Sequence, residues 1–224
     1  MTAPPFAPIL EAAQARLGAA TLAARLAQPR APVELEALGD DRYLSQMSLR
    51  IFRAGLRHSL VDAKWPAFEE VFGGFEPRRI RAMPDEALEA LLADRRLIRH
   101  WGKLKAVRDN AASMIAVAEE HGSFGGWIAR WPTADIVGLW EALAKRFSQM
   151  GGNSGPTFLR MVGKDTFLLT HAVGAALKRW GAVEGPVKNR QDRVVTQSCF
   201  NAWAAETGRP LCQLSQILAA SVED

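Results

Sequence analysis

Apolar residues recur at intervals of three or four positions along nearly the whole chain of 224 residues. This is the spacing of one buried helix face. No segment alternates apolar and polar residues with the β-branched side chains that are typical of strands. The pattern therefore predicts an all-α fold with short connections, and no internal repeat interrupts it.

Breaks in this pattern give the expected helix boundaries. We expect helices over about residues 6–26, 40–56, 64–72, 76–82, 84–92, 104–118, 127–131, 133–150, 155–161, 165–180, 190–207 and 210–222. Pro66 is expected in the first turn of its helix, because proline lacks the N–H that a helix interior needs. Residues 1–38 are expected to form an N-terminal helical extension, or to pack onto a domain made of residues 39–224.

The charge balance adds a mild preference for a polyanionic partner. The formal net charge is +4 and the pI is about 9.4, and basic residues gather around residues 78–81, 95–108 and 178–193. Such clusters suit nucleic acid, although a solvated helix face explains any one of them equally well.

Cysteine usage and hydropathy narrow the class of protein further. Cys199 and Cys212 are too few for a disulfide framework and lack metal-ligand spacing, so we expect buried thiols in a reducing compartment. No apolar run reaches the roughly 18 residues that cross a bilayer. Residues 1–5 lack the pattern of a secretory signal. We therefore expect a cytoplasmic protein with no membrane partner, no metal and no cofactor.

The segment Met-Gly-Gly-Asn-Ser-Gly-Pro-Thr, residues 150–157, joins two amphipathic helices and is the most informative local pattern. Small residues leave backbone N–H groups open at a helix N-terminus, where the helix dipole favours an anion. We expect a phosphate to bind at Gly152, Asn153, Ser154, Gly155 and Thr157. An ordinary tight turn between two helices is the alternative interpretation.

Four segments of the chain carry a family resemblance through their order and spacing. They are Ala54-Gly55-Leu56 with residues 65–83, the stretch 97–111 with its Arg-His-x-Gly-Lys core, the hairpin at 151–157, and the tail at 200–211. Together they span about residues 40–220, and the Arg-His-x-Gly-Lys core is the most specific of them. The chain resembles 3-methyladenine DNA glycosylase I and its relatives in the helix-hairpin-helix DNA glycosylase superfamily.

This resemblance implies a monomer that binds double-stranded DNA containing a damaged or modified base. Such an enzyme extrudes the nucleotide from the duplex and hydrolyses its N-glycosidic bond. Beyond the hairpin, the resemblance implies DNA contacts by Arg99, Lys103, Lys164 and His171. A capping or buried role is the alternative for His171. The implied base pocket consists of Arg50, Phe52, His58 and Trp65.

The chain departs from the family where catalysis is expected. Relatives with a segment like Gly163–Phe167 resemble this chain but place an Asp where it has Ala172. A methyl group offers neither the negative charge nor the proton acceptor of a carboxylate. The 3-methyladenine enzymes use a Glu from an earlier helix, where this chain has Arg50, and a Trp where it has His58. Their zinc-binding Cys and His residues are missing as well.

Three explanations for Ala172 stay open at this stage. Ala172 is an engineered replacement that leaves an inactive enzyme, or Asp165 supplies the carboxylate, or the protein binds DNA without catalysis. Asp165 is otherwise expected to cap a helix that starts at Thr166. Lyase chemistry is not expected, since the position of the Schiff-base lysine in bifunctional relatives carries Thr157.

Overall fold

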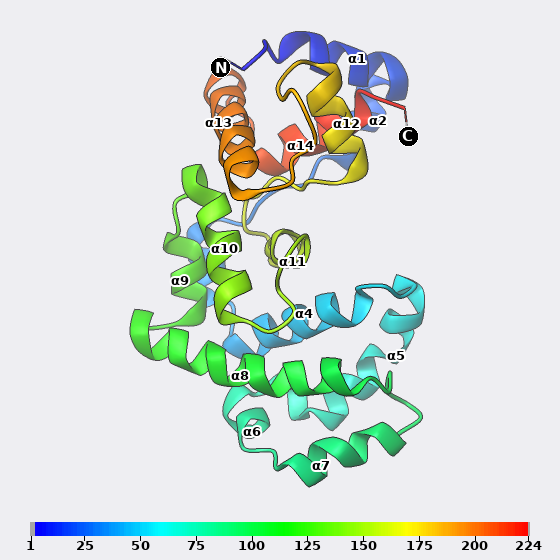
Figure 1. The fold of residues 1–224 in the computed structure, drawn as a ribbon, viewed down its shortest axis with the longest axis vertical. Helices are drawn as coiled ribbons and strands as arrows, with labels where there is room; N and C mark the ends of the chain where they lie inside the picture. The colour runs from blue at the N-terminus through cyan, green and yellow to red at the C-terminus, as the bar shows by residue number, and fades with distance from the viewer. Residues whose placement is uncertain (1–2, 224) are drawn as a thin grey trace. The chain divides into compact units, whose positions relative to one another are not determined.

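The computed structural model describes residues 3–223, and within them every regular element is a helix, which confirms the all-α prediction. These residues form two compact units, each described by itself below (Figure 1). Residues 31–131 and 139–164 make the first, here called the hairpin unit. Residues 3–30, 132–138 and 165–223 make the second, here called the terminal unit. Over the described part of the chain, no helix combines the length and hydrophobicity that a bilayer crossing requires.

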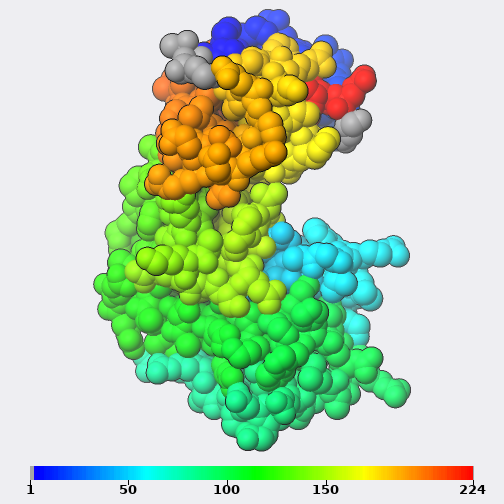
Figure 2. Space-filling model, in the orientation of Figure 1, coloured from blue at the N-terminus to red at the C-terminus, as the bar shows by residue number. Residues whose placement is uncertain are grey.

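The hairpin unit is built around one long helix. Its helices are α3 (Pro32–Ala37), α4 (Asp40–Arg53), α5 (His58–Val71), α6 (Pro77–Arg81), α7 (Asp85–Ala90), α8 (Trp101–His121), α9 (Phe124–Arg130), most of α10 (Ile136–Arg146) and α11 (Ser154–Val162), with short 3₁₀ turns at Gly73–Phe75 and Leu91–Ala93. Helix α8 packs against α4, α6 and α9, while α11 packs against α4. Figure 2 shows the yellow-green segment that contains α11 lying against the cyan-blue segment that contains α4.

Helix α4 shows how the sequence pattern produces this packing. It buries Leu44, Met47 and Ile51, which recur three and four positions apart, together with Tyr43 beside them. The Tyr43 hydroxyl donates to the carbonyl of Leu35 at 2.8 Å, so its polar atom is satisfied inside the core.

The terminal unit combines both ends of the described chain. It contains α1 (Ala7–Leu17), α2 (Ala19–Arg25), α12 (His171–Arg179), α13 (Arg190–Thr207) and α14 (Leu211–Ala220), besides a 3₁₀ turn at Thr133–Asp135. Helix α14 packs against α1, α12 and α13. Trp203 is fully buried, and its Nε1 donates to the carbonyl of Pro4 at 2.7 Å. Residues 3–30 therefore share a core with the last helices, and the domain boundary after residue 38 stays a prediction.

Some predicted helix boundaries are wrong. Helix α5 begins at His58 rather than at Lys64, which places Pro66 inside the helix. Burial of Val61 and Phe68 on one face of α5 outweighs the local preference of proline for a first turn. The single helix expected over residues 6–26 is divided at Gly18, whose φ of 80° is left-handed. Helix α9 begins at Phe124 rather than at Trp127, because the Ser123 hydroxyl caps it by accepting a hydrogen bond from the Gly126 amide.

The helix predicted over residues 165–180 is shorter at its start. Residues 165–170 are not helical, and α12 begins at His171. The hydroxyl of Thr170 caps it by accepting a hydrogen bond from the Val173 amide at 3.2 Å. Asp165 is consequently not the cap of this helix.

Candidate functional site

The predicted hairpin lies between α10 and α11 of the hairpin unit. Two residues in it have left-handed backbone, Gln149 with φ 60° and Gly152 with φ 58°. The Ser154 amide donates to the carbonyl of Gly151 at 3.1 Å, and the Gly155 amide donates to that of Met150 at 3.2 Å. These bonds close a tight turn immediately before the first residues of α11.

The turn changes which amides a phosphate could use. The N–H groups of Ser154 and Gly155 are engaged inside the turn, and that of Thr157 donates to the carbonyl of Asn153 at 3.1 Å. The expected phosphate cradle formed by these three amides is therefore not present in this arrangement. Gly151 and Gly152 are exposed, and their amides make no hydrogen bond with any other part of residues 3–223. Among the predicted residues Gly152 keeps an open amide, and Gly151, which was not predicted, adds a second one.

Gly155 has a packing role. A Cβ atom at this position would lie 3.1 Å from the carbonyl oxygen of Met150 and 3.7 Å from Leu143 of α10. The same construction at Gly151 or Gly152 meets nothing within 4 Å. Gly155 thus lets α11 approach α10 closely, while the two earlier glycines face open space.

Helix α8 holds the hairpin in place through side chains. Asn110 is fully buried in α8, and its amide group both donates to the carbonyl of Ser148 at 3.1 Å and accepts from the amide of Ser148 at 2.7 Å. Gln149 Nε2 donates to the carbonyl of Gly102 at 2.7 Å. Three hydrogen bonds therefore tie residues 148–149 to α8 and fix where the hairpin stands within this unit.

The Arg-His-x-Gly-Lys segment is the start of α8, and most of its side chains hold backbone groups. His100 Nδ1 accepts from the Lys103 amide at 3.3 Å and caps the helix. Lys103 Nζ donates to the carbonyls of Phe52 at 3.2 Å and Ala54 at 2.7 Å, at the C-terminal end of α4. Arg99 and Lys103 are the two residues of this segment predicted to contact DNA, and of these only Arg99 has an exposed side chain. We therefore assign Lys103 a structural role.

Lys164 is used in the same way at another helix end. It is 5% exposed, and its Nζ donates to the carbonyls of Ala129 at 3.1 Å and Trp131 at 2.6 Å, where α9 ends. Cations are favourable at helix C-termini because the last carbonyls lack partners within the helix. Both lysines predicted to contact DNA thus donate hydrogen bonds to backbone carbonyls at the C-terminal ends of helices.

The predicted base-pocket residues divide into two aromatic residues that contact other rings and two polar residues that do not. Phe52 is fully buried and lies 6.2 Å, centroid to centroid, from Trp65. The Trp65 ring is nearly parallel to those of Phe68 and Phe75, with centroids 4.9 and 5.4 Å away. Its Nε1 donates to the Ser45 hydroxyl at 3.2 Å. Phe52 and Trp65 consequently belong to an aromatic core cluster.

His58 and Arg50 differ from that cluster. His58 begins α5 and is exposed, and its side chain makes no hydrogen bond, ion pair or ring contact with another residue in the described chain. Arg50 is partly buried in α4, and its Nε makes no hydrogen bond within residues 3–223. Burial, and secondarily the neighbouring Arg53, lowers the pKa of Arg50. Burial, and secondarily Arg50, likewise lowers the pKa of Lys103. The position where the resemblance led us to expect a carboxylate thus carries a cationic side chain here.

The other candidate catalytic position lies in the terminal unit. Ala172 is half-buried in the first turn of α12, directly after the exposed His171. A cavity of about 440 Å³ borders the same helix and is lined in part by Thr170, His171, Gly174 and Lys178. Ala172 is not among its lining residues.

Asp165 has a definite structural partner. Its Oδ2 accepts from the Leu211 amide at 3.0 Å and its Oδ1 accepts from the Cys212 amide at 2.9 Å. These are the first two residues of α14, whose preceding residue Pro210 supplies no side-chain cap. Asp165 therefore caps α14 rather than the helix that follows it in sequence.

Two functional features were missed in the sequence. Asn110 is a polar residue on the buried stripe of α8 that includes Val107, Ala111 and Met114, and a buried amide on such a stripe indicates a specific hydrogen-bond partner. Gln149 carried no local signal, because its left-handed backbone depends on contact with α8.

Comparison with known proteins places this arrangement among the helix-hairpin-helix DNA glycosylases. Residues 35–150 match the model of the methyladenine glycosylase family, and the chain belongs to that family. The match covers the hairpin unit as far as Met150, so Ala172 lies outside it.

Solved structures show the same fold at low identity. A 3-methyladenine DNA glycosylase I from Staphylococcus aureus is 19% identical with a TM-score of 0.51, over 62% of this chain and 80% of that one. A point variant of 3-methyladenine DNA glycosylase I in complex with 3-methyladenine is 19% identical with a TM-score of 0.53, over 67% and 88%. The Methanocaldococcus jannaschii 8-oxoguanine glycosylase/lyase, in complex with DNA containing 8-oxoguanine, is 14% identical with a TM-score of 0.52, over 94% and 93%.

Proposed function

We propose that this protein binds double-stranded DNA containing a damaged or modified base and extrudes the affected nucleotide from the duplex. The hairpin carries this proposal, because the exposed amides of Gly151 and Gly152 are unpartnered within residues 3–223 and α8 fixes the turn that presents them. Backbone N–H groups of this kind suit a phosphate oxygen. Membership of the methyladenine glycosylase family supports the DNA backbone as the source of the bound phosphate.

The chemical step proposed for this scaffold is hydrolysis of the N-glycosidic bond. Departure of the base leaves positive charge on the sugar, which a nearby carboxylate stabilises while it accepts a proton from the attacking water. Position 172 is our candidate for that carboxylate, and it carries alanine. Asp165 is a poor substitute for that carboxylate, because both of its oxygens accept hydrogen bonds from backbone amides of α14. We therefore expect strong binding but little base release by this chain.

Restoring the carboxylate tests the catalytic part of the proposal. The Ala172→Asp variant is expected to release base from at least one alkylated, oxidised or deaminated duplex about a hundredfold faster than the unaltered chain. Ala172→Asn is the matched control, because it has nearly the same shape without the charge. Base release is measured as strand cleavage at the resulting abasic site after alkali. Equal rates for the two variants on every lesion would contradict the assignment of position 172.

A second variant tests the hairpin directly. Gly151→Glu adds a negative charge at an exposed position with open space around it, so the chain should fold while a phosphate is repelled. Val33→Glu adds the same charge on α3, where Val33 is 70% exposed. DNA affinity, measured by fluorescence anisotropy at several salt concentrations, should fall at least tenfold in the first variant only. Equal affinities for the two variants would exclude the hairpin as the phosphate site.

A non-catalytic DNA-binding protein is the second candidate function. The engagement of Asp165 in capping α14, with Ala172 and Arg50 at the two positions expected to be acidic, favours it. This candidate predicts hairpin-dependent binding in the unaltered chain and no base release by Ala172→Asp. The two experiments together therefore separate an inactivated glycosylase from a protein that only binds.

A further inference from the structure

One of the seven tryptophans differs from the other six. Trp101 is 37% exposed, and it makes no ring contact or hydrogen bond through its side chain within residues 3–223. The others are each buried or engaged: Trp65, Trp127, Trp131, Trp140, Trp180 and Trp203. An indole left open to water on a helix end is unusual for so large an apolar ring.

Trp101 lies beside the hairpin. It is the first residue of α8, and the carbonyl of the next residue, Gly102, accepts the hydrogen bond from Gln149 at 2.7 Å. Gln149 in turn stands two residues before Gly151. The first turn of α8, which carries the exposed ring, is therefore in direct contact with the residue that leads into the hairpin.

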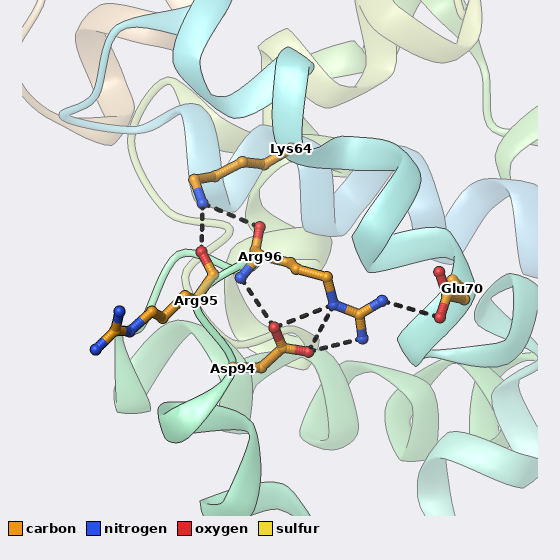
Figure 3. A network of polar contacts seen from close by, with 5 residues as sticks. All are labelled: Lys64, Glu70, Asp94, Arg95 and Arg96. Atoms are coloured by element: carbon orange, nitrogen blue, oxygen red, sulfur yellow. Dashed lines mark hydrogen bonds and ion pairs between the residues drawn. The ribbon is translucent and has the colours of Figure 1, made fainter.

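The segment before Trp101 is fixed by a polar network, drawn in Figure 3. Lys64 Nζ of α5 donates to the carbonyls of Arg95 at 2.8 Å and Arg96 at 3.0 Å. The Arg96 guanidinium is paired with Asp94 at 2.8 Å and with Glu70 at 3.0 Å. These contacts hold the backbone of the segment against α5.

Two arginines of this segment remain outside the network. Figure 3 shows the Arg95 side chain pointing away from the other four residues. Arg95 and Arg99 are both exposed, and neither forms an ion pair with any carboxylate of the described chain. The segment thus presents two exposed arginines without ion pairs, six and two residues before the unpartnered aromatic ring.

We propose that Trp101 stacks on an unpaired nucleobase of the bound duplex, while Arg95 and Arg99 contact phosphates of the adjoining backbone. The inference rests on the proposed function, since extrusion of one nucleotide leaves its partner base unpaired. An aromatic ring accepts any base as a stacking partner, and flanking cations track the backbone. This combination of charge and ring selects DNA with an opened base pair over intact duplex.

The experiment compares two duplexes of one sequence. One is fully paired, and the other carries a tetrahydrofuran abasic analogue that leaves the opposite base unpaired. Trp101→Ala is expected to weaken binding to the abasic duplex about tenfold and to change binding to the paired duplex little. Trp101→Phe should retain most of the affinity because it keeps an aromatic face. Val33→Ala, which removes another exposed apolar side chain, should change neither.

Other outcomes distinguish the inference from the function on which it rests. Equal losses on both duplexes, or a Trp101→Ala variant that binds like Val33→Ala, would overturn the stacking role while leaving hairpin binding intact. Absence of DNA binding by the unaltered chain would overturn both proposals. Arg95→Ala and Arg99→Ala should each weaken binding to both duplexes similarly. Each should also lower by about one the slope of the logarithm of DNA affinity against the logarithm of salt concentration. Unchanged slopes would show that these arginines do not contact phosphates.

Discussion

The start of α8 and the start of α12 both contain residues that sequence resemblance marks as functional, yet the two regions use them differently. At α8, the motif residues His100 and Lys103 bond to backbone groups, and Asn110 further along the helix does the same, so α8 organises the fold around the hairpin. At α12, Ala172 and His171 hold nothing in place within the described chain, and Thr170 alone caps the helix. Replacing a side chain that bonds to backbone groups lowers the stability of the fold. Replacing a side chain without such contacts can remove a catalytic group and leave the fold intact.

Replacing Asn110 is the strongest test of whether α8 anchors the hairpin. Asn110→Ala leaves the partly buried amide and carbonyl of Ser148 without their side-chain partner and is expected to lower the free energy of unfolding by about 2 kcal/mol. Chemical denaturation measures the change. Asn201→Ala is the matched control, since its Nδ2 makes one exposed hydrogen bond to the carbonyl of Ala134 at 2.9 Å. Similar losses in the two variants would show that α8 does not anchor the hairpin.

Asp165 provides the corresponding test in the terminal unit. Asp165→Ala removes the acceptors for the first two amides of α14 and is expected to cost about 1–2 kcal/mol of stability. Asp165→Asn, which keeps one acceptor, should lose less. Neither change should reduce base release when it is combined with Ala172→Asp and measured well below the melting temperature. A loss of release without a loss of stability would instead place Asp165 in catalysis.

The smallest expected effect concerns the charge of Lys103. Its pKa is lowered from the ordinary value of 10.5 by burial, and further by Arg50, so the unfolded chain binds this proton more tightly than the folded one. Stability contributed by this residue therefore rises with pH as the folded-state pKa is passed. The difference in unfolding free energy between the unaltered chain and Lys103→Met should increase as the pH rises towards 10.5, the ordinary pKa of a lysine. A constant difference would mean that the folded and unfolded pKa values are equal.

The periodic pattern was sufficient to predict the helical class and the place of the hairpin, because both depend on neighbours in sequence. Contacts between distant segments could not be predicted. Lys103 looked like a surface cation, but its acceptors lie 49 and 51 residues away, at the C-terminal end of α4. Asp165 looked like a local cap, but its partners follow 46 and 47 residues later.

The same limit applies to the aromatic residues. Seven tryptophans are equivalent in the sequence, and only packing distinguishes the exposed Trp101 from those in the core. Phe52 and Trp65 were predicted to line a pocket, and that role stays a prediction. Their contacts with Phe68 place them in an aromatic cluster that joins α4 and α5, which the sequence pattern of either helix alone does not specify.

The ion pairs of Arg96 have a consequence for how ionic strength acts on this surface. Arg96 and Glu70 are 53% and 69% exposed, so dissolved salt screens their attraction. Raising the salt concentration therefore loosens the support of Arg95 and Arg99 at the same time as it competes for their phosphates. A plot of DNA affinity against salt would then be steeper than the number of protein–phosphate contacts alone requires. The number of phosphate contacts can be derived from that slope only after the same measurement on Glu70→Gln, which lacks the salt-sensitive ion pair with Arg96.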